Sequence, residues 1–360
     1  MKNFGLPKAM SIILCILCLI MIGEFAFVLV KGTEKKVTPS VERLHVEGTR
    51  LVGESGEVKT FRGMSFGWHN IWPRFYNEAA VKYLHNEWGC NIFRAAIGAD
   101  DHAKSDNPGI HGGYASEPEF ALECACKVID GAIASGAYVI VDWHSHSIHL
   151  DEAKSFFTAI ATRYKGCPNI IYELFNEPVC FSFENGAENP YEDLGSPEKM
   201  DEYWQALKAY ASELIETITA IDDNEPVILM GCPSWDQRID LPASSPVEGY
   251  ANLMYTMHFY AATHGQWLRD ATDAAMNAGI PVFISECAGC EATGDGYLDK
   301  DAWKIYSDWA TDNCMSMMAW SISDKVETCS MLTKDAASEG PWNGEVVKEW
   351  GQMVRTWINE

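Results

Sequence analysis

Two glutamates stand where a carboxyl side chain could do chemistry. Glu177 stands just beyond the largely apolar run 170–175, and Glu286 directly follows the largely apolar run 282–285. A protonated carboxyl can give its proton to a leaving oxygen, and an ionised one can attack a carbon atom. Two carboxyl groups about 5 Å apart can hydrolyse a glycosidic bond with retention of configuration. We therefore expect Glu177 to act as general acid/base and Glu286 as nucleophile if the fold brings them together.

The elements that must position these glutamates alternate between two kinds. Eight β-prone runs are separated by longer stretches with apolar residues at helical spacing, which predicts a parallel sheet. The runs are 60–64, 91–95, 138–143, 170–175, 227–231, 253–259, 282–285 and 315–320, and helical patterns include 79–87, 118–135, 202–221 and 268–278. Eight strands predict an α/β fold of the closed (β/α)8 TIM barrel type, with the glutamates after strands four and seven. The turn-rich stretch 51–60 is expected to form a hairpin that caps the barrel floor.

Polar and aromatic residues gather at the ends of the expected strands. In a (β/α)8 barrel the chemistry lies at the carboxyl ends of the strands. Six of the eight runs end in such residues: Arg94; Asp142, Trp143 and His144; Asn176 and Glu177; His258 and Tyr260; Glu286; and Trp320. A single polar side chain at the end of a strand usually has a structural role, with its hydrogen bonds made within the fold. Six strands that end in such residues on one rim of the barrel predict an active site.

Two segments carry a family resemblance: IIYELFNEP at 170–178 and IPVFISE at 280–286 resemble glycoside hydrolase family 5. Further motifs fall in the family's order: GMS 63–65, WG 88–89, FRAA 93–96, VDWH 141–144, HFY 258–260, THG 263–265, ATGDG 292–296 and AWS 319–321. The resemblance covers nearly all of the chain beyond residue 40 and is strongest to bacterial endoglucanases. It implies cleavage of internal β-1,4-glucosidic bonds of cellulose or related β-glucans by double displacement, with no cofactor.

The resemblance also implies roles for five supporting residues. Arg94 and Tyr260 would hold the nucleophile ionised and aimed, because charge-assisted donors stabilise a carboxylate. Asn176 would donate to the 2-hydroxyl of the sugar at the cleavage point. His144 and His258 would hydrogen-bond the sugar or orient the two acids.

Sugar binding would need an open groove with aromatic platforms, because pyranose rings present flat C–H faces. The candidates are four tryptophans and two charged residues after the eighth run: Trp320, Trp235, Trp68, Trp72, Lys325 and Glu327. The first two stand in places that match the family. Packing explains the other two tryptophans equally well, and the charged pair would bind sugar hydroxyls.

Other polar residues have plainer interpretations. Asp142 is expected to be a buried partner of a neighbouring donor rather than a third acid. Glu173, four residues before the expected acid, should point into the barrel and need a partner there. His69, His146 and His149 could be metal ligands, but surface or loop histidines are the simpler interpretation.

Two features depart from the family pattern. Cys287 stands where the family usually has tryptophan after the nucleophile, so the wall behind the nucleophile must pack differently. The stretch 179–200 is longer than the resembling enzymes carry after strand four. Such a loop could narrow the cleft, shift the preference among cellulose, mixed-linkage glucan and mannan, or bind an ion through its carboxylates.

The amino-acid composition limits the classes of partner that the protein could bind. The formal net charge is −24, from 27 Lys and Arg against 51 Asp and Glu, which argues against nucleic acid and suits a neutral β-glucan polysaccharide. Of 12 cysteines, two lie in the apolar amino-terminal segment, leaving 12 − 2 = 10 in the folded part. Cys124-x-Cys126 and Cys287-x-x-Cys290 lack histidines at zinc spacing, so we predict no metal site.

The amino terminus predicts export. An apolar run, 9–30, is broken only by Glu24 and flanked by lysines, and it is long enough to span a bilayer. Its length favours an uncleaved membrane anchor, while Glu24 and a shorter core ending near Gly23 favour a cleaved signal. We expect residues 1–36 to be signal or anchor and linker, residues 37–360 to be one catalytic barrel, and the protein to be an extracytoplasmic monomer.

Two alternatives to the endoglucanase remain at this stage. A mannanase or mixed-linkage glucanase could use the same scaffold and the same two glutamates. A non-catalytic carbohydrate-binding barrel would require one glutamate to be lost or misplaced, and both are present.

Overall fold

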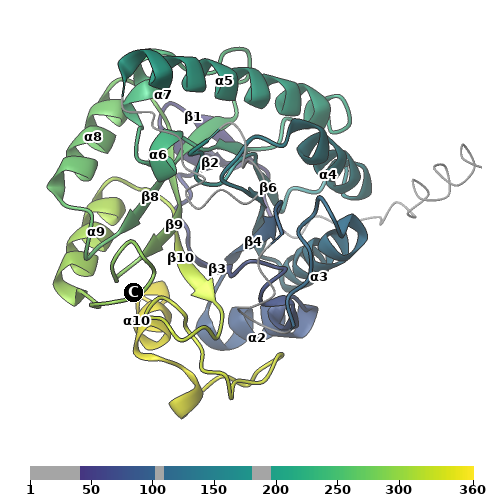
Figure 1. Ribbon diagram of the computed structural model, residues 1–360, viewed down its shortest axis with the longest axis vertical. Helices are drawn as coiled ribbons and strands as arrows, with labels where there is room; N and C mark the ends of the chain where they lie inside the picture. The colour runs from purple at the N-terminus through teal and green to yellow at the C-terminus, as the bar shows by residue number, and fades with distance from the viewer. Residues whose placement is uncertain (1–40, 102–108, 181–195) are drawn as a thin grey trace, which may run out of the picture.

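A closed barrel of eight parallel strands forms the centre of the computed structural model, which describes residues 41–101, 109–180 and 196–360 (Figure 1). The strands run around the barrel in the order β10-β3-β4-β5-β6-β7-β8-β9. Their bounds are β3 Arg62–Phe66, β4 Ile92–Gly98, β5 Tyr138–His144, β6 Ile170–Glu173, β7 Ile228–Met230, β8 Leu253–Tyr260, β9 Val282–Ala288 and β10 Met317–Ile322. The predicted (β/α)8 barrel is confirmed.

Helices form a ring outside the strands (Figure 1). The longer ones are α2 Glu78–Trp88, α3 Pro118–Ser135, α4 Leu150–Arg163, α5 Pro197–Thr219, α8 Gln266–Asn277, α9 Lys300–Asp312 and α10 Glu349–Ile358. Helix α2 shows how the sequence sets the ends: the Asn77 side chain accepts from the Ala80 N–H, and Gly89 ends the helix at φ 75°. A side-chain cap satisfies a free N–H, and glycine tolerates the left-handed turn.

Every residue of β4, β5, β8 and β9 is buried, because one face packs inside the barrel and the other against the helices.

The eight strands lie where the sequence predicts them along the chain, but several begin or end at other residues than predicted. The predicted run 91–95 stops short of β4, so Arg94 lies inside the strand rather than at its end. The predicted run 170–175 overshoots β6, which stops at Glu173, so Asn176 and Glu177 lie in the following loop.

The barrel floor is closed by an antiparallel hairpin of β1 Leu44–Glu47 and β2 Arg50–Gly53. Leu44 and Leu51 of this hairpin pack into the lower barrel interior with Ile92, Ile140 and Phe283. The predicted cap is therefore confirmed. Within the predicted stretch 51–60 the chain folds back on itself: Val52 bridges Val58, and the Gly53 N–H donates to the Glu57 carbonyl oxygen at 3.0 Å. The sequence did not predict β1, which pairs with β2 through a turn at 48–49.

A register shift in β9 changes which side chains reach the barrel interior. Thr256 of β8 pairs with Phe283, but His258 pairs with Glu286, so β9 carries one more residue than β8 between these two pairs. The pairing of β9 with β10 shifts over the same stretch. An extra residue in one strand breaks the strict alternation of faces. The shift lets the adjacent Ser285 and Glu286 both contact groups inside the barrel.

Two expectations fall partly or wholly outside the described residues. The apolar segment 9–30 is one, so the signal or anchor stays a prediction; in the described part of the chain, no helix is both long and apolar enough to cross a membrane. The other is the long loop after the acid, of which residues 181–195 are not described. Helix α5 takes up its last residues from Pro197 onward.

Candidate active site

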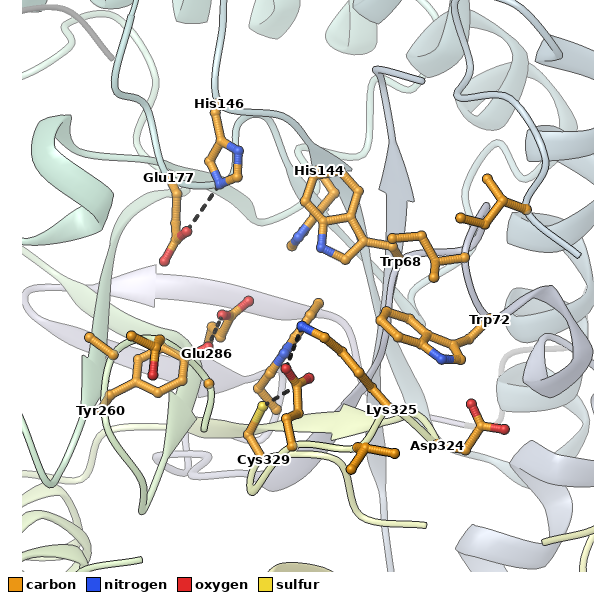
Figure 2. Close-up of a pocket in the computed structure, with 18 of the residues that line it drawn as sticks. Trp68, Trp72, His144, His146, Glu177, Tyr260, Glu286, Asp324, Lys325 and Cys329 are labelled. Atoms are coloured by element: carbon orange, nitrogen blue, oxygen red, sulfur yellow. Dashed lines mark hydrogen bonds and ion pairs between the residues drawn. The ribbon is translucent and has the colours of Figure 1, made fainter. Parts of the chain in front are cut away.

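A cleft of about 740 Å³ opens at the carboxyl ends of the strands (Figure 2). Both predicted acids and five predicted supporting or binding aromatic residues line it: Glu177, Glu286, His144, Tyr260, Trp68, Trp72 and Trp320 are all on its wall, as are Lys325 and Glu327. These residues come from distant parts of the chain, so only the closed barrel brings them to one rim.

Glu286 is held by two donors. Arg94 Nη1 donates to its Oε2 at 2.9 Å, and the Tyr260 hydroxyl donates to its Oε1 at 2.8 Å. Glu286 is only 4% exposed, so these bonds replace most of its hydration. Burial and the adjacent carboxylate raise the pKa of Tyr260 well above its ordinary value, so the hydroxyl keeps its proton and remains a donor. The predicted roles of Arg94 and Tyr260 fit this geometry.

Arg94 is the centre of a fully buried network. Its Nε donates to Glu173 Oε2 at 2.7 Å, and its Nη2 lies 2.9 Å from Asp142 Oδ2. Burial opposes the charged guanidinium, but the carboxylates of Asp142, Glu173 and Glu286 raise the pKa of Arg94 well above its usual range. Asp142 and Glu173 are thus the buried structural partners that the sequence predicted, and the network fixes the guanidinium that holds Glu286.

Arg94 also fixes the amide of Asn176. Its Nη2 donates to Asn176 Oδ1 at 2.7 Å, which sets the orientation of the amide. The buried Asn176 Nδ2 has no hydrogen-bond partner among the described residues. A fixed donor with no protein acceptor is what a sugar hydroxyl would require, in keeping with the predicted role.

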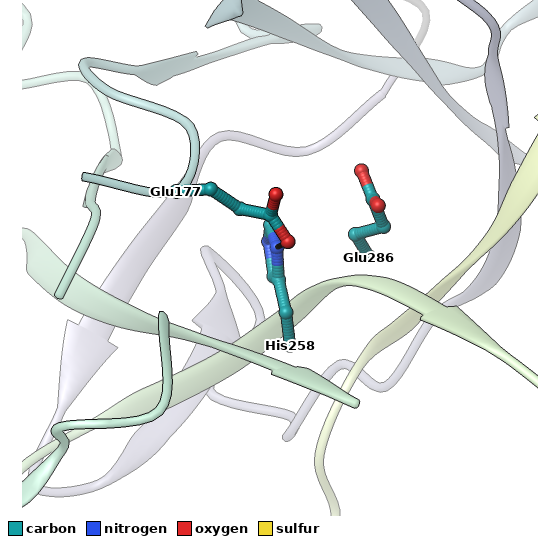
Figure 3. A group of neighbouring side chains, drawn as sticks. All are labelled: Glu177, His258 and Glu286. Atoms are coloured by element: carbon teal, nitrogen blue, oxygen red, sulfur yellow. Dashed lines mark hydrogen bonds and ion pairs between the residues drawn. The ribbon is translucent and has the colours of Figure 1, made fainter. Parts of the chain in front are cut away.

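Glu177 lies between two histidines, and Figure 3 shows it beside His258 and opposite Glu286. Its Oε1 lies 3.1 Å from His258 Nδ1, and its Oε2 lies 3.3 Å from His146 Nε2. A carboxylate oxygen of Glu177 lies within 4.8 Å of one of Glu286. Glu177 has φ 43°, a left-handed conformation that is unusual for a residue with a side chain.

Glu177 and His258 form a buried carboxyl–histidine pair whose pKa values shift in opposite directions. Burial raises the pKa of Glu177, but hydrogen bonds from His146 and His258 outweigh it and hold the pKa below the ordinary value. Burial lowers the pKa of His258, but nearby carboxylates, Asp236 first and then Glu177, raise it to about 9. Two groups this close titrate as a pair and exchange one proton.

His144 is set between an acid and two aromatic rings. Its Nδ1 lies 2.6 Å from Asp142 Oδ2, its ring stacks on Trp320 with centroids 5.2 Å apart, and Trp68 meets it edge-on at 4.2 Å. Burial lowers the pKa of His144 well below its ordinary value, so the ring is neutral. With Nδ1–H directed at Asp142, Nε2 is left as an acceptor for a ligand in the cleft.

Charged and aromatic groups form the rest of the wall. Lys325 Nζ lies 2.5 Å from Glu327 Oε2, and Lys348 donates to the carbonyl oxygens of both residues. Trp72 is 9% exposed, lines the same cleft, and lies on the side of Figure 2 where Lys325 and Asp324 lie. These positions agree with the predicted sugar-binding role.

Trp235 is not among the described residues that line this cleft. It lies in α6 (Pro233–Asp236), is 38% exposed, and has φ 56°. Its role in sugar binding stays a prediction. Cys287 is fully buried and donates to the Met318 carbonyl oxygen at 3.3 Å, so it packs against β10 where the family usually has tryptophan.

Sequence reasoning missed three residues around the acid. His146 was expected to be an ordinary loop histidine, but it contacts Glu177 directly. Asp236 accepts the backbone N–H of Glu177 at 3.0 Å, and Ser285 lies 2.8 Å from His258 Nε2. Only the spacing of the HSH triplet at 144–146 could have drawn attention to His146; the other two depend on backbone geometry.

The other two histidines that were considered as metal ligands, His69 and His149, have structural contacts. His69 is fully buried rather than at the surface, and its Nδ1 accepts the Gly98 N–H at 2.9 Å. His149 Nε2 lies 2.8 Å from Asp100 Oδ1. In the described part of the chain all ten cysteines are free thiols.

One group of side chains has the spacing of a metal site. Glu177, His258 and Glu286 each place a ligand atom within 4.8 Å of the others. The Arg94 guanidinium donates to Glu286, however, and a protonated His258 adds a second positive charge. Two positive charges oppose a cation here, and the same spacing suits the predicted roles of Glu177 in proton transfer and Glu286 in nucleophilic attack.

The fold and the site together define a (β/α)8 barrel enzyme with the two facing carboxyl groups that glycoside hydrolases use. Comparison with known proteins agrees. The cellulase family, glycosyl hydrolase family 5, matches residues 52–326. The chain belongs to this family, as its motifs predicted.

Relatives are similar over most of this chain. An endoglucanase of Clostridium saccharobutylicum is 33% identical over 320 residues, which are 87% of this chain and 64% of the relative. Endoglucanase Z of Dickeya dadantii is 33% identical over 86% of this chain and 67% of the relative. The chain thus spans about two thirds of the length of these relatives.

Solved structures confirm the fold. A protein from Cytophaga hutchinsonii is 31% identical with a TM-score of 0.76, covering 88% of this chain and 94% of that one. The catalytic domain of Thermobifida fusca endoglucanase Cel5A is 29% identical with a TM-score of 0.74, covering 88% of this chain and 97% of that one. A further structure of the Thermobifida catalytic domain is a complex with cellotetraose.

Proposed function

We propose that this protein is a retaining endo-β-1,4-glucanase that hydrolyses cellulose or related β-glucans. The observation that carries the proposal is the approach of Glu177 and Glu286, whose carboxylate oxygens come within 4.8 Å of each other. Retaining enzymes have carboxyl groups about 5–5.5 Å apart, whereas inverting enzymes leave about 6.5–9.5 Å for a water molecule. The short separation supports direct attack by one carboxylate.

In the first step Glu286 attacks the anomeric carbon while the bond to the leaving oxygen breaks. Glu177 gives its proton to that oxygen, which departs as a hydroxyl of the released chain. In the second step Glu177, now ionised, takes a proton from water, and the hydroxide displaces Glu286 from the anomeric carbon. Glu177 then holds a proton again, and the overall reaction consumes one water per bond cleaved.

The donors around the site would stabilise charge as it develops. Arg94 and Tyr260 would stabilise Glu286 when it is released as a carboxylate. Asn176 Nδ2 would bond to the sugar 2-hydroxyl, and His144 Nε2 would accept from another hydroxyl. Preorganised donors of this kind need no reorganisation during the reaction.

The choice of β-glucan rests on the cleft wall and on the relatives. Trp68, Trp72 and Trp320 line an open cleft of about 740 Å³, which suits a chain of flat sugar rings. The relatives are called endoglucanases, and a structural neighbour binds cellotetraose. We propose that the same class of polymer binds here.

The proposal is tested by activity and by stereochemistry. Wild type should release reducing ends from carboxymethyl cellulose, and proton NMR should show the β-anomer first. Glu286→Gln should lose at least about 10³-fold in kcat, because the nucleophile is gone. Glu349→Gln, which removes a surface partner of Lys300, is the matched control and should keep full activity. An α-anomer as first product, or full activity of Glu286→Gln, would refute the mechanism.

A panel of cellulose, barley glucan and glucomannan tests the substrate separately. The highest kcat/KM on a mannan would replace the glucanase assignment and leave the two-glutamate mechanism intact.

We also propose that the protein is exported by its amino-terminal segment, on the strength of the lysine-flanked apolar run 9–30. Amino-terminal sequencing of protein recovered from outside the cytoplasm tests this and separates anchor from cleaved signal. Protein found only inside the cytoplasm would contradict it.

A further inference from the structure

Asp236 is a fully buried carboxylate that does not line the cleft. It ends α6, the short turn after β7, and its side chain accepts two backbone N–H groups. Its Oδ2 accepts the N–H of Glu177 at 3.0 Å, and its Oδ1 accepts the N–H of Cys232. The bond to Glu177 joins the turn after β7 to the backbone of the acid/base.

The turn that carries Asp236 is held in a costly conformation. Ser234, Trp235 and Asp236 have φ of 59°, 56° and 59°, so three consecutive residues with side chains are left-handed. Such conformations cost energy and persist where surrounding contacts impose them. Here the Ser234 N–H donates to the Pro178 carbonyl at 3.0 Å, which ties the turn to the loop of Glu177 a second time.

Asp236 also lies beside the histidine that shares a proton with Glu177. His258 Nδ1 is 3.4 Å from Asp236 Oδ2 and 3.1 Å from Glu177 Oε1. One ring nitrogen therefore faces two carboxylates. The other ring nitrogen, Nε2, lies 2.8 Å from Ser285 Oγ.

The hydrogen bonds determine which nitrogen carries the exchangeable proton. The Ser285 hydroxyl donates to Glu173 Oε1 at 2.6 Å, so its oxygen can only accept from His258. Nε2 must then be protonated, and Nδ1 is the position that gains or loses a proton. The shared proton can be in one of two positions. Either Glu177 carries it and donates to His258 Nδ1, or Nδ1 carries it and donates to Glu177.

We propose that Asp236 is a positioning residue for the acid/base, whose charge keeps the shared proton on the Glu177–His258 pair at alkaline pH. The proposal rests on the proposed role of Glu177 as acid/base. A negative charge 3.4 Å from Nδ1 favours the protonated pair over the deprotonated one. The general acid would thus keep its proton supply to higher pH than the same pair without Asp236.

The pKa directions agree with this geometry. Asp236 is the first of the carboxylates that raise the pKa of His258 to about 9 against burial. Burial raises the pKa of Asp236 itself to about 7, opposed by His258, so Asp236 is ionised in the alkaline range where the effect is needed.

Other titratable groups on neighbouring elements surround the Glu177–His258 pair, at positions different from that of Asp236. His258 also faces Glu286 of β9, Glu173 of β6, Asp142 of β5 and His264 after β8, and Glu177 faces His146 after β5. Among the residues that the structure describes, the charged groups that act most strongly on Asp236 are His258 and Glu177, and Thr256 and Cys232 also hydrogen-bond to it. A change at Asp236 leaves the surrounding charges in place.

The test is the pH dependence of kcat/KM for Asp236→Asn on an aryl β-cellobioside with a poor leaving group, which needs the acid. The basic limb should move to lower pH by about 1–3 pH units, the effect of removing one adjacent charge. On a substrate with an activated leaving group that needs no acid, this limb should vanish from both proteins. Asp240→Asn, a change at an exposed partner of Arg238 nearby, should keep the wild-type profile.

An Asp236→Asn protein with an unmoved basic limb would overturn the proposal. If that variant does not fold, Asp236→Ser keeps an uncharged acceptor and should show the same shift. Wild type gives an independent measurement: the NMR resonance that disappears in His258→Gln should titrate near pH 9, and titration near the ordinary histidine value would overturn the proposal. If Glu177→Ala loses activity but the pH profile of Asp236→Asn matches that of wild type, only the role of Asp236 is refuted. If Glu177→Ala keeps full activity, the proposed function itself is refuted.

Discussion

Ser285 and Glu286 are neighbours in a β-strand, yet both side chains face the inside of the barrel. Ser285 donates to Glu173 at 2.6 Å, and Glu286 accepts from Tyr260 at 2.8 Å. Adjacent residues of a regular strand face opposite ways, and the extra residue in β9 between its pairings with Thr256 and His258 removes that constraint. One strand thereby supplies both Glu286, the proposed nucleophile, and a link through His258 to Glu177, the proposed acid/base.

The serine gives the first prediction. Ser285→Ala leaves Glu173 Oε1 without this donor and His258 Nε2 without an acceptor. We expect the free energy of unfolding to fall by about 1–3 kcal/mol, because both groups are buried, with kcat reduced but not abolished. Urea unfolding measures this. Ser212→Ala, on the exposed face of α5, is the control and should change stability by less than about 0.5 kcal/mol. Equal effects in both variants would contradict the link.

The acid/base gives the second prediction. Glu177→Ala should lose about 10²–10⁴-fold in kcat on cellulose or on an aryl cellobioside with a poor leaving group. It should lose far less in the first step with an activated leaving group, which departs without a proton. Added azide, a nucleophile that needs no base, should then accelerate turnover and give a glycosyl azide. A loss that does not depend on the leaving group would show that Glu177 has another role.

The third prediction concerns the donor to the nucleophile. Tyr260→Phe removes the hydroxyl that lies 2.8 Å from Glu286 and keeps the ring. Hydrogen bonds to charged groups contribute about 1.5–3 kcal/mol, so kcat should fall about 10–100-fold. Tyr83→Phe, which removes a hydroxyl bonded to the Trp342 carbonyl away from the cleft, should leave kcat unchanged. The expected role fails if the two variants have the same kcat.

Stability should decrease as the pH rises from about 6.5 to 9. The pKa of His258 is raised from 6.5 to about 9, so its contribution is complete below 6.5 and is lost as the pH passes through 9. The contribution is up to about 3 kcal/mol. Asp142 and Asp236, raised from 3.8 to about 7, act in the same direction at lower pH. Urea midpoints against pH test this: His258→Gln should flatten the decline above pH 7, and an equally steep curve in that variant would exclude His258 as its source.

The last prediction concerns the cleft wall. Trp68→Ala should raise KM for cello-oligosaccharides about 2–10-fold, the effect of losing one aromatic contact, with a smaller change in kcat. Trp267→Ala, a change at a half-exposed tryptophan that does not line the cleft, should leave KM unchanged. A Trp68 effect on kcat alone would assign it to holding His144, which its ring contacts at 4.2 Å.

The sequence by itself determined the barrel and the residues that meet at its rim, Glu177 and Glu286 among them. Alternation of strand and helix patterns predicts a parallel barrel, and the rule that chemistry follows strand ends places Glu177 and Glu286 on one rim. Arg94, Asn176, His258 and Tyr260 were singled out by the same rule, although Arg94 lies inside β4, and the roles proposed for them come from the family resemblance. The positions could be predicted because periodicity and strand order are local properties of the chain.

Only the tertiary structure decided how the acid/base is held. The register shift in β9 arises from pairing with β8 and β10, and the left-handed turn ending at Asp236 is fixed by contacts with the loop of Glu177. Neither leaves a periodic trace in the sequence, because both are set by backbone pairing between segments distant along the chain. For the same reason the contact of His146 with Glu177 could not be predicted from the sequence, because it forms only when the loops after β5 and β6 meet at the rim.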